Sequence, residues 1–361
     1  MQRSLGLLFI FFASIFFTTN AVAAASPSDE YIRGYMAAIL ETQFELPDAQ
    51  IAVSAGKVTI TVPQSKNRQG LAQKIETKGP KGVIAVAIKE TGNGGTDWFP
   101  DERLFRPLLA DPRWPHFYAS YQAYTKAEEL DSVGSVGFGE NFPIIGGDLM
   151  GGRWQAGAQF GVFAIFDMDS DSHDLINADY RVGIPVIYRH NDFSAIARIY
   201  HQSSHLGDEY LLRGEDIQDN RENLSYEAIS ALLSYDYNDK LRFYGGGEYI
   251  FHQSFDNDTK REDLNPWSIQ FGGDYIGNAL AQKFWRGDVR FVAGADFRSM
   301  EEADWDTDIS LRLGFDFSGK GWHEDDRSVR ILLEYFDGRS PHGQFYDEEI
   351  EYVGIGAHLY Y

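Results

Sequence analysis

The sequence contains no cysteine, which excludes disulfides, thiol nucleophiles and thiolate-bound metals. Basic residues are also scarce, since 32 Lys and Arg stand against 54 Asp and Glu, for a formal net charge of −22. Nucleic acid is therefore not an expected partner, because binding phosphates requires a basic face. Long hydrophobic runs are missing as well: the longest, residues 5–17, has 13 residues, too few to span about 30 Å of hydrocarbon as a helix. Residence in a membrane would therefore require β-strands.

The N-terminus has the pattern of a secretory signal peptide. Arg3 precedes the apolar run, and the small residues Ala21-Val22-Ala23 follow it. This order of a basic start, an apolar run and small residues is typical of a cleaved leader. We expect residues 1–25 to be the signal peptide, with cleavage after Ala23 or Ala25, and the mature protein to be exported.

From residue 117 onward the pattern is that of β-strands. Near the end of the chain, Ile309, Leu311 and Leu313 alternate with Ser310 and Arg312. Period-2 alternation places apolar side chains on one face of a strand and polar ones on the other. Twelve strands are expected, at residues 117–124, 132–142, 153–166, 178–189, 193–203, 223–237, 240–252, 267–277, 286–298, 306–317, 327–337 and 349–361.

The connections between these strands differ in length. Tight turns are expected at 190–192 and 238–239, whereas 204–222, 253–266 and 338–348 are long. Barrels of the outer membrane have short periplasmic turns and longer outer loops. The expected fold class is therefore all-β: an antiparallel outer-membrane β-barrel of about 12 strands. A soluble β-sandwich or propeller is the alternative. The segment 143–152 departs from the rule as a longer inner loop.

The last nine residues, 353–361, have an apolar face that includes Val353, Ile355 and Tyr361. Such a strand, closed by an aromatic residue, resembles the terminal strand of bacterial outer-membrane barrels. Aromatic residues make up 15% of the chain, in keeping with the aromatic girdles of these proteins. The resemblance implies residence in the outer membrane of a Gram-negative bacterium and insertion by the barrel-assembly machinery.

Residues 28–90 have a mixed pattern that predicts a small α+β domain. A helix is expected over 29–44, strands at 51–53, 58–62 and 83–88, and a second helix at 69–75. With Gly56-Lys57-Val58-Thr59-Ile60 and Gly82-Val83, this order resembles the BON domain of bacterial envelope proteins, which implies a periplasmic location and contact with phospholipid. A plain periplasmic spacer is the alternative, and a periplasmic partner is possible for either. Residues 91–116 form a Pro- and Trp-rich connector to the barrel at 117–361.

The polar faces of the expected strands carry charges of both signs. These interior residues are Arg181, Arg189, Arg198, Arg242, Glu248, Asp274, Arg290, Asp296, Arg298, Asp308, Arg312, Asp316, Arg330 and Glu334. Buried charges persist when they are paired. One interpretation is a filled, cross-linked interior, and the other is a narrow charged channel for small solutes.

His201 and Ser203 are candidates for catalysis. Both share the outward parity of their strand, near its outer end. A base beside a hydroxyl can make a nucleophile when a third group orients the imidazole. Glu227, expected next to His201 on the following strand, is the candidate for that role. The alternatives are Asp208, Glu209 and Glu215 in the loop between the two strands. A second copy, His252-Gln253-Ser254, has His252 on the interior parity and is interpreted as structural.

This arrangement resembles outer-membrane phospholipase A and the lipid A deacylases, barrels that carry His-x-Ser toward the outer leaflet. The resemblance covers His201 and Ser203 alone and implies hydrolysis of acyl esters of phospholipid or lipid A by a serine-type enzyme. The phospholipase pattern continues Ser-Asn-Gly, whereas Ser204-His205 follows here. A polar rim that binds lipopolysaccharide or only supports the loop is the alternative.

Acidic residues near the outer ends of two strands are candidates for a calcium site. They are Asp167, Asp169, Asp171 and Asp174 at one tip and Asp208 and Glu209 in a long loop. Oxygen ligands suit Ca²⁺, but the spacing lacks the glycine and terminal glutamate of an EF-hand. A solvated acidic loop is the alternative, and Ca²⁺ is the one candidate cofactor.

Three further motifs point to one family. Trp98-Phe99-Pro100, the segment 108–115 (Leu-Leu-Ala-Asp-Pro-Arg-Trp-Pro) and residues 201–209 resemble an uncharacterised bacterial envelope family, domain of unknown function 1207. That family implies no reaction. Lipid ester hydrolysis, a solute channel and a non-catalytic envelope anchor or assembly protein all remain as functional hypotheses.

Overall fold

The computed structural model describes residues 27–44, 46, 49–54, 56–63, 75, 78–80, 83–91, 96–100, 102–127, 130–214, 224–237, 240–254, 264–281, 284, 287–318 and 327–360. The chain divides into two compact units, residues 1–93 and 94–361. The expected signal peptide, most of the expected helix at 69–75 and Tyr361 lie outside the described residues. Within the described part of the chain, no helix has the length and apolar character needed to cross a membrane.

The first unit combines one helix with a three-stranded sheet. Its elements are α2 (Asp29–Phe44), β1 (Gln50–Ser54), β2 (Lys57–Pro63) and β3 (Ala85–Thr91). β1 and β2 form an antiparallel hairpin, and β3 runs parallel to β2. One face of the helix packs against the sheet, in a cluster of Ile32, Met36, Ile39, Leu40, Val53, Val58, Ile60 and Ile75. This unit therefore has an apolar core of its own.

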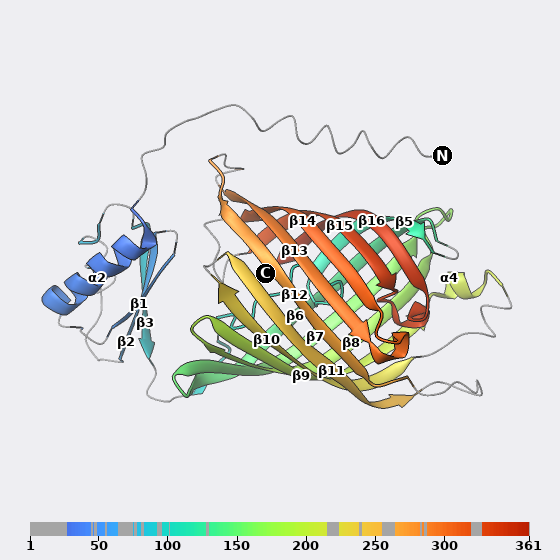
Figure 1. Cartoon of the computed structure of the whole chain (residues 1–361), viewed down its shortest axis with the longest axis horizontal. Coiled ribbons are helices and arrows are strands. Elements are labelled where there is room, and N and C mark those ends of the chain that lie inside the picture. The colour runs from blue at the N-terminus through green and yellow to red at the C-terminus, as the bar shows by residue number, and fades with distance from the viewer. Residues whose placement is uncertain are drawn as a thin grey trace. The chain divides into compact units, whose positions relative to one another are not determined.

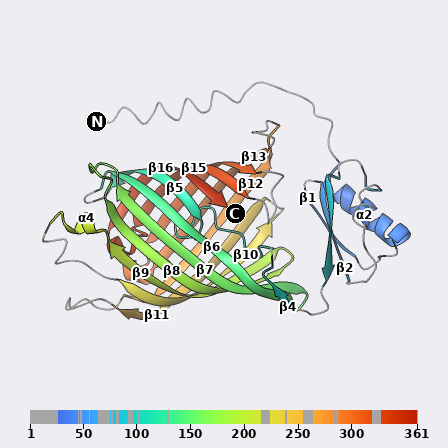
Figure 2. The ribbon, with the colours of Figure 1, turned by 180° about the vertical axis from the view of Figure 1, so that it is seen from behind.

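The second unit is a closed antiparallel barrel of twelve strands (Figures 1 and 2). They are β5 (Phe117–Lys126), β6 (Ser132–Leu149), β7 (Gly152–Asp167), β8 (Leu175–His190), β9 (Phe193–Leu206), β10 (Ser225–Tyr237), β11 (Leu241–Ser254), β12 (Trp267–Ala279), β13 (Asp288–Met300), β14 (Thr307–Ser318), β15 (Ser328–Arg339) and β16 (Glu349–Tyr360). Each strand pairs with the next along the chain, and β16 pairs with β5 to close the wall. The predicted fold class and strand number are confirmed.

The connections define two ends of the barrel. The two longest, 207–224 and 255–266, lie at the same end, which is the outer end by the rule for such barrels. The first of them contains the short helix α4 (Asp208–Leu211). At the opposite, inner end, β6 and β7 join through Met150 and Gly151, with φ of 49° and 79°. Positive φ at two successive residues is the geometry of a tight hairpin turn.

The longer inner loop expected at 143–152 is wrong, because β6 continues to Leu149. The pairing of β6 with β7 shifts register between Pro143 and Ile145 and then resumes. Proline has no N–H to donate to the ladder, so a bulge at this position lets the strand continue past it. The proline and the break in alternation made the second half of β6 resemble a loop in the sequence.

The faces of the strands are as expected from period-2 alternation. Val353 and Ile355 on β16 are 48% and 51% exposed, whereas Tyr352 is 3% exposed. Apolar side chains thus cover the outside, which is the surface that lipid requires. The predicted interior charges are buried or half-buried, including Arg181, Asp274 and Glu334. The chain is therefore an outer-membrane β-barrel protein.

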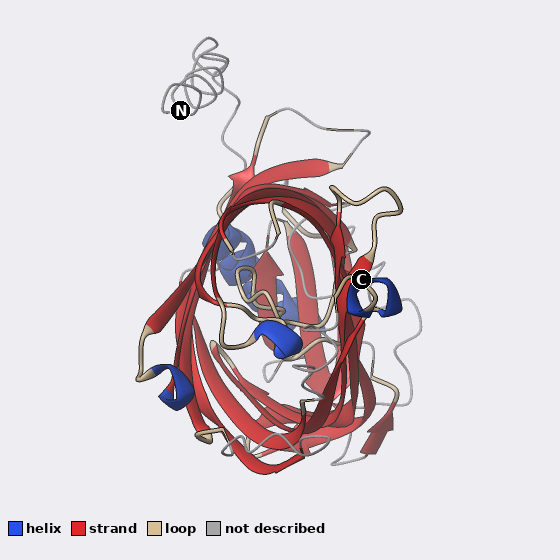
Figure 3. Cartoon of the chain, turned by 90° about the vertical axis from the view of Figure 1, so that its right-hand side faces the viewer, coloured by secondary structure: helices blue, strands red, loops and turns tan. Residues whose placement is uncertain are grey.

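The segment before the first barrel strand lies inside the barrel. β4 (Thr96–Trp98) pairs with the inner end of β6, and residues 102–116, called the plug below, then cross the interior. Figure 3 shows loop segments inside the ring of strands. Leu104, Phe105, Leu108 and Trp114 are at most 2% exposed and pack on inward side chains of the wall, Ile187, Ile196, Leu232 and Tyr244. The segment expected as a connector therefore fills part of the lumen.

Candidate functional site

Three neighbouring strands align histidine, glutamate and serine side chains on the outer surface of the barrel. Between β9 and β10, His201 pairs with Glu227, and Ser203 with Ser225. Between β10 and β11, Glu227 pairs with His252, and Ser225 with Ser254. Paired residues of antiparallel strands share a face and lie side by side. The result is a row of His–Glu–His next to a row of Ser–Ser–Ser.

Glu227 is hydrogen bonded to both histidines. His201 Nδ1 lies 2.9 Å from Glu227 Oε1, and His252 Nδ1 lies 2.6 Å from Glu227 Oε2. A carboxylate accepts hydrogen bonds, so each imidazole donates through Nδ1 and its Nε2 carries the free lone pair. The predicted contact between His201 and Glu227 is present, and each carboxylate oxygen serves one ring.

Ser203 lies two residues along the same strand face from His201. Its position on β9 is fixed by the pairing of Ser203 with Ser225 on one side and with Tyr180 on the other. Among the residues that the structure describes, no hydrogen bond joins Ser203 to His201. Catalytic hydrogen bonds are often long in structures without substrate and tighten when substrate binds.

The second copy of the motif is also on the outer surface, so its assignment to the interior is wrong. β11 has a bulge at Phe251, because Ala228 pairs with Ile250 and Glu227 with His252. The extra residue reverses the alternation beyond it. His252 is consequently 67% exposed, compared with 41% for His201. Simple counting of residues along the strand could not reveal this.

The site lies at the level of the outer membrane interface. His201 is eight residues beyond Phe193 at the inner turn, which at about 3.3 Å per residue and a tilt of about 40° is about 20 Å of height. The apolar band of such barrels is about 25 Å tall. Tyr180, opposite Ser203, is 48% exposed, and Tyr and Trp side chains are enriched at this interface. The row therefore lies near the upper edge of the band.

The acidic residues proposed for calcium are not assembled into a site. Asp169, Asp171, Asp208 and Glu209 are exposed, and no group of three or more His, Asp or Glu side chains within the described ranges has the geometry to hold a metal. Arg213 bridges the acids around that turn, at 2.8 Å from Asp167 and 2.7 Å from Asp174.

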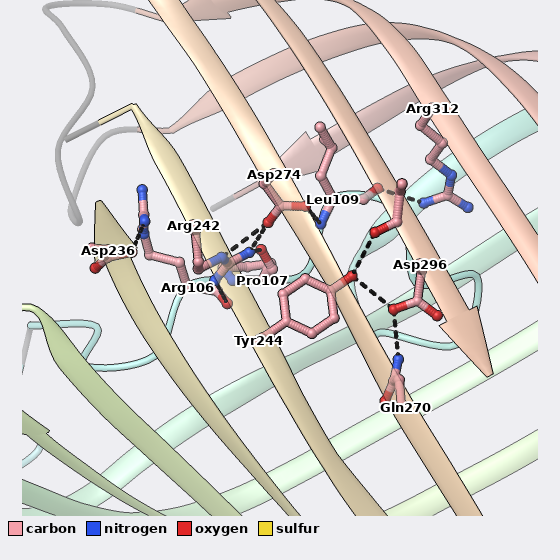
Figure 4. Close-up of polar contacts among 11 residues, drawn as sticks. Arg106, Pro107, Leu109, Asp236, Arg242, Tyr244, Gln270, Asp274, Asp296 and Arg312 are labelled. Carbon is pink, nitrogen blue, oxygen red and sulfur yellow. Dashed lines mark hydrogen bonds and ion pairs between the residues drawn. The ribbon is translucent and has the colours of Figure 1, made fainter. Parts of the chain in front are cut away.

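Wall residues hold the plug through its backbone (Figure 4). Arg242 donates to the carbonyls of Arg106 and Pro107, at 2.7 and 2.6 Å, and also to Asp274, whose other oxygen accepts from the Leu109 amide at 3.3 Å. Arg312 donates to the Leu109 carbonyl at 3.1 Å. An irregular segment needs partners for its backbone groups. The interior charges thus bind the plug as well as one another.

An open cavity lies between the plug and the outer connections. It has a volume of about 1180 Å³, counted with its mouth. Asp111 and Arg113 of the plug line it together with wall residues such as Arg181, Glu248 and Asp296. Arg113 is paired with Asp179 at 2.8 Å, and Asp296 accepts from Tyr244 and Gln270 at 2.7 and 2.9 Å. The outer part of the lumen is therefore a chamber floored by the plug.

Comparison with known proteins identifies a family. The family model described as protein of unknown function (DUF1207) matches residues 22–361, and no curated protein matches the chain. Among solved structures, outer membrane phospholipase A from Escherichia coli is 13% identical with a TM-score of 0.48, covering 72% of this chain and 95% of that one. The Salmonella typhi phospholipase dimer with bound calcium is 14% identical, with a TM-score of 0.46 and coverage of 69% and 94%. LpxR from Salmonella typhimurium is 10% identical, with a TM-score of 0.34 and coverage of 68% and 99%.

Proposed function

The chain belongs to the DUF1207 family of proteins of unknown function, and we propose that it hydrolyses acyl esters of lipids in the outer leaflet of the outer membrane. In this proposal Ser203 is the nucleophile, His201 the general base and Glu227 the orienting group. The observation that carries it is the 2.9 Å hydrogen bond between His201 Nδ1 and Glu227 Oε1. It directs the basic Nε2 of an outward-facing imidazole away from the carboxylate, on the strand face that carries Ser203.

The chemistry follows from this arrangement. Ser203 Oγ attacks the ester carbonyl while His201 Nε2 takes the hydroxyl proton, and the Oγ–C bond forms. Collapse of the tetrahedral intermediate breaks the ester C–O bond, and His201 returns the proton to the leaving alcohol. Water then attacks the acyl-serine by the same route and releases a fatty acid. Glu227 stabilises the imidazolium that forms twice in each cycle.

The location of the site supports a lipid as substrate. Ester bonds of membrane lipids lie at the boundary between head groups and hydrocarbon, the level estimated for His201 above. Directly below, Ile199 and Ile229 are 55% and 45% exposed and offer an apolar surface for the acyl chain. Phospholipid and the lipid A portion of lipopolysaccharide both present such esters there, so these lipids are the proposed partners.

The solute-channel hypothesis receives less support. The plug fills part of the lumen and is held there by apolar contacts and by hydrogen bonds to its backbone. Conduction would require this segment to leave. A planar-bilayer recording tests the point: steady ohmic current from the full-length protein would favour the channel and argue against a fixed plug.

We propose that the N-terminal unit lies in the periplasm, and the pairing of β4 with the inner end of β6 supports this. The helix α2 exposes Tyr31 and Tyr35, which are 57% and 41% exposed with ring centroids 6.4 Å apart. Exposed paired aromatics suit binding to a periplasmic partner or a membrane surface. Deletion of residues 28–90 should leave a folded barrel that has lost any such binding.

Hydrolysis is tested with the refolded protein in mixed micelles of phosphatidylethanolamine, and separately of lipid A, with released fatty acid measured by mass spectrometry. Ser203→Ala should lower the release that depends on this serine by about 10³-fold or more. Ser225→Ala is the matched control: it lies beside Ser203 on the outer face but has no histidine two residues before it. Its activity should be within about twofold of wild type.

Two further samples complete the test. Glu227→Gln should lower the rate strongly without unfolding the barrel, because the side chain is on the surface. Addition of EDTA decides whether calcium takes part, and undiminished release would remove Asp169, Asp171, Asp208 and Glu209 from the mechanism. Absence of release from correctly folded wild-type protein on both lipids would refute the hydrolase proposal.

A further inference from the structure

The outer surface carries two His-x-Ser pairs related by the central strand β10. His201 and Ser203 lie on β9, and His252 and Ser254 lie on β11. Glu227 pairs with both histidines, and Ser225 pairs with both serines. The two pairs therefore have the same strand spacing, the same face and the same relation to Glu227.

Hydrogen bonding treats the two histidines alike. Each donates through Nδ1, and each uses a different oxygen of the Glu227 carboxylate, at 2.9 Å for His201 and 2.6 Å for His252. Both rings are thus held in the tautomer that leaves Nε2 basic. The Glu227 carboxylate therefore orients His252 in the same way as His201.

The bulge at Phe251 is what makes the second pair possible. Without reversal of the alternation, residues 252 and 254 would point to the interior, as counting from the inner turn predicts. With it, His252 is on the surface beside Glu227, and Ser254 lies beside Ser225 on the same face. A bulge next to a functional site often serves to redirect a side chain in this way.

We propose that His252 and Ser254 form a second acyl-transfer site that shares Glu227 with the first. This rests on the proposed function, since it assigns the same chemistry to a second serine. Ser254 Oγ attacks an ester carbonyl, its proton passes to His252 Nε2 and then to the leaving alcohol, and water releases the acyl group. Oxidants, metals and further cofactors are not needed for this step.

The distance between the two serines indicates the substrate class. Ser203 and Ser254 are separated by two strand spacings, about 9.6 Å at 4.8 Å each. One ester carbonyl cannot contact both serines at once, but the ester carbonyls of two chains of one lipid can. The substrate class is therefore a lipid with two or more ester-linked chains, from which the site removes different chains at the two serines.

Active-site labelling separates this proposal from the first. The refolded protein is treated with a fluorophosphonate, which modifies serines activated by a base, and the peptides are analysed by mass spectrometry. We expect modification at both Ser203 and Ser254, and none at Ser225. His252→Ala should abolish labelling of Ser254 and leave that of Ser203 within about threefold, whereas Glu227→Gln should slow both.

Activity measurements complete the test. Ser203→Ala should keep a measurable fraction of fatty acid release, and the double variant Ser203→Ala/Ser254→Ala should have none. Labelling of Ser203 alone, with unchanged release from Ser254→Ala, would overturn the second site and leave the proposed hydrolase intact. Labelling of neither serine, with no release from the folded protein, would overturn both. Gel mobility before and after heating verifies folding of each variant.

Discussion

Trp114→Ala tests whether the plug is an integral part of the barrel. The Trp114 side chain is fully buried inside the lumen. It stacks on Phe105 with ring centroids 5.6 Å apart and an interplanar angle of 19°, and the Arg198 guanidinium lies 5.3 Å from its centroid. Removing the indole would leave a void between the plug and the wall that rigid strands cannot close.

Two routes give a similar magnitude for the loss. Burial of about 200 Å² at about 25 cal/mol per Å² amounts to about 5 kcal/mol, and truncation of buried tryptophans typically costs about 3–5 kcal/mol. Within the described part of the chain the indole Nε1 has no hydrogen-bond partner, so no hydrogen bond is lost. We expect the free energy of unfolding to fall by about 4 kcal/mol.

The assay is urea unfolding in detergent micelles, followed by circular dichroism. With an m-value of about 2 kcal/mol per M, the midpoint should fall by about 2 M. Trp305→Ala removes the same side chain where it is 45% exposed, in an outer connection, and should cost less than about 1 kcal/mol. A loss below about 1 kcal/mol for Trp114→Ala would refute the view that the plug stabilises the barrel.

Three further predictions concern the interior and its outer cover. Asp274→Asn leaves Arg242 buried without its carboxylate and should cost about 3–5 kcal/mol in the same unfolding assay. His342 lies in the outer connection 340–348, and its burial lowers the pKa of the imidazole to about 4. The positive charge of Arg113 lowers this pKa further, whereas the negative charge of Asp179 opposes the shift. Below the ordinary pKa of histidine the unfolded chain binds a proton at this residue that the folded chain does not. The contribution of His342 to stability should therefore fall by about 3 kcal/mol as the pH decreases from about 6.5 to about 4, and His342→Gln should remove this contribution. Full-length protein should give no steady current in planar bilayers.

Much of the barrel could be predicted because its physical requirements repeat along the chain. In every strand one face contacts lipid and the other faces the barrel interior, so apolar and polar residues alternate with a period of two in each of the twelve strands. The contact of His201 with Glu227 was predicted from the same regularity, since the strand pairing on either side of the connection 207–224 has no bulge between Phe193 and Ser203. Where strand pairing is regular, counting residues from the turn predicts the position of each side chain.

Where strand pairing is irregular, as in β6 and β11, counting residues along the strand does not predict which face a side chain lies on. One shift at Pro143 concealed seven residues of strand, 143–149, and another at Phe251 placed His252 on the wrong face. Bulges depend on contacts with the partner strand, which are absent from the local pattern. The second His-x-Ser pair could be recognised once the register of three strands was known.

A sequence signal for the plug is the excess of arginine among the expected interior residues. That set contains eight arginines and six carboxylates, and each guanidinium has five N–H donors. Carboxylates of the wall alone leave many of these donors without acceptors, which is costly in a buried interior. Backbone carbonyls of an irregular segment supply the missing acceptors, as the bonds of Arg242 and Arg312 to the plug show. The prolines at 107, 112 and 115 prevent this segment from forming a helix in which its carbonyls would accept hydrogen bonds from its own amides. The arginines of the barrel strands therefore supply donors for the plug carbonyls, and the plug carbonyls supply acceptors for those arginines.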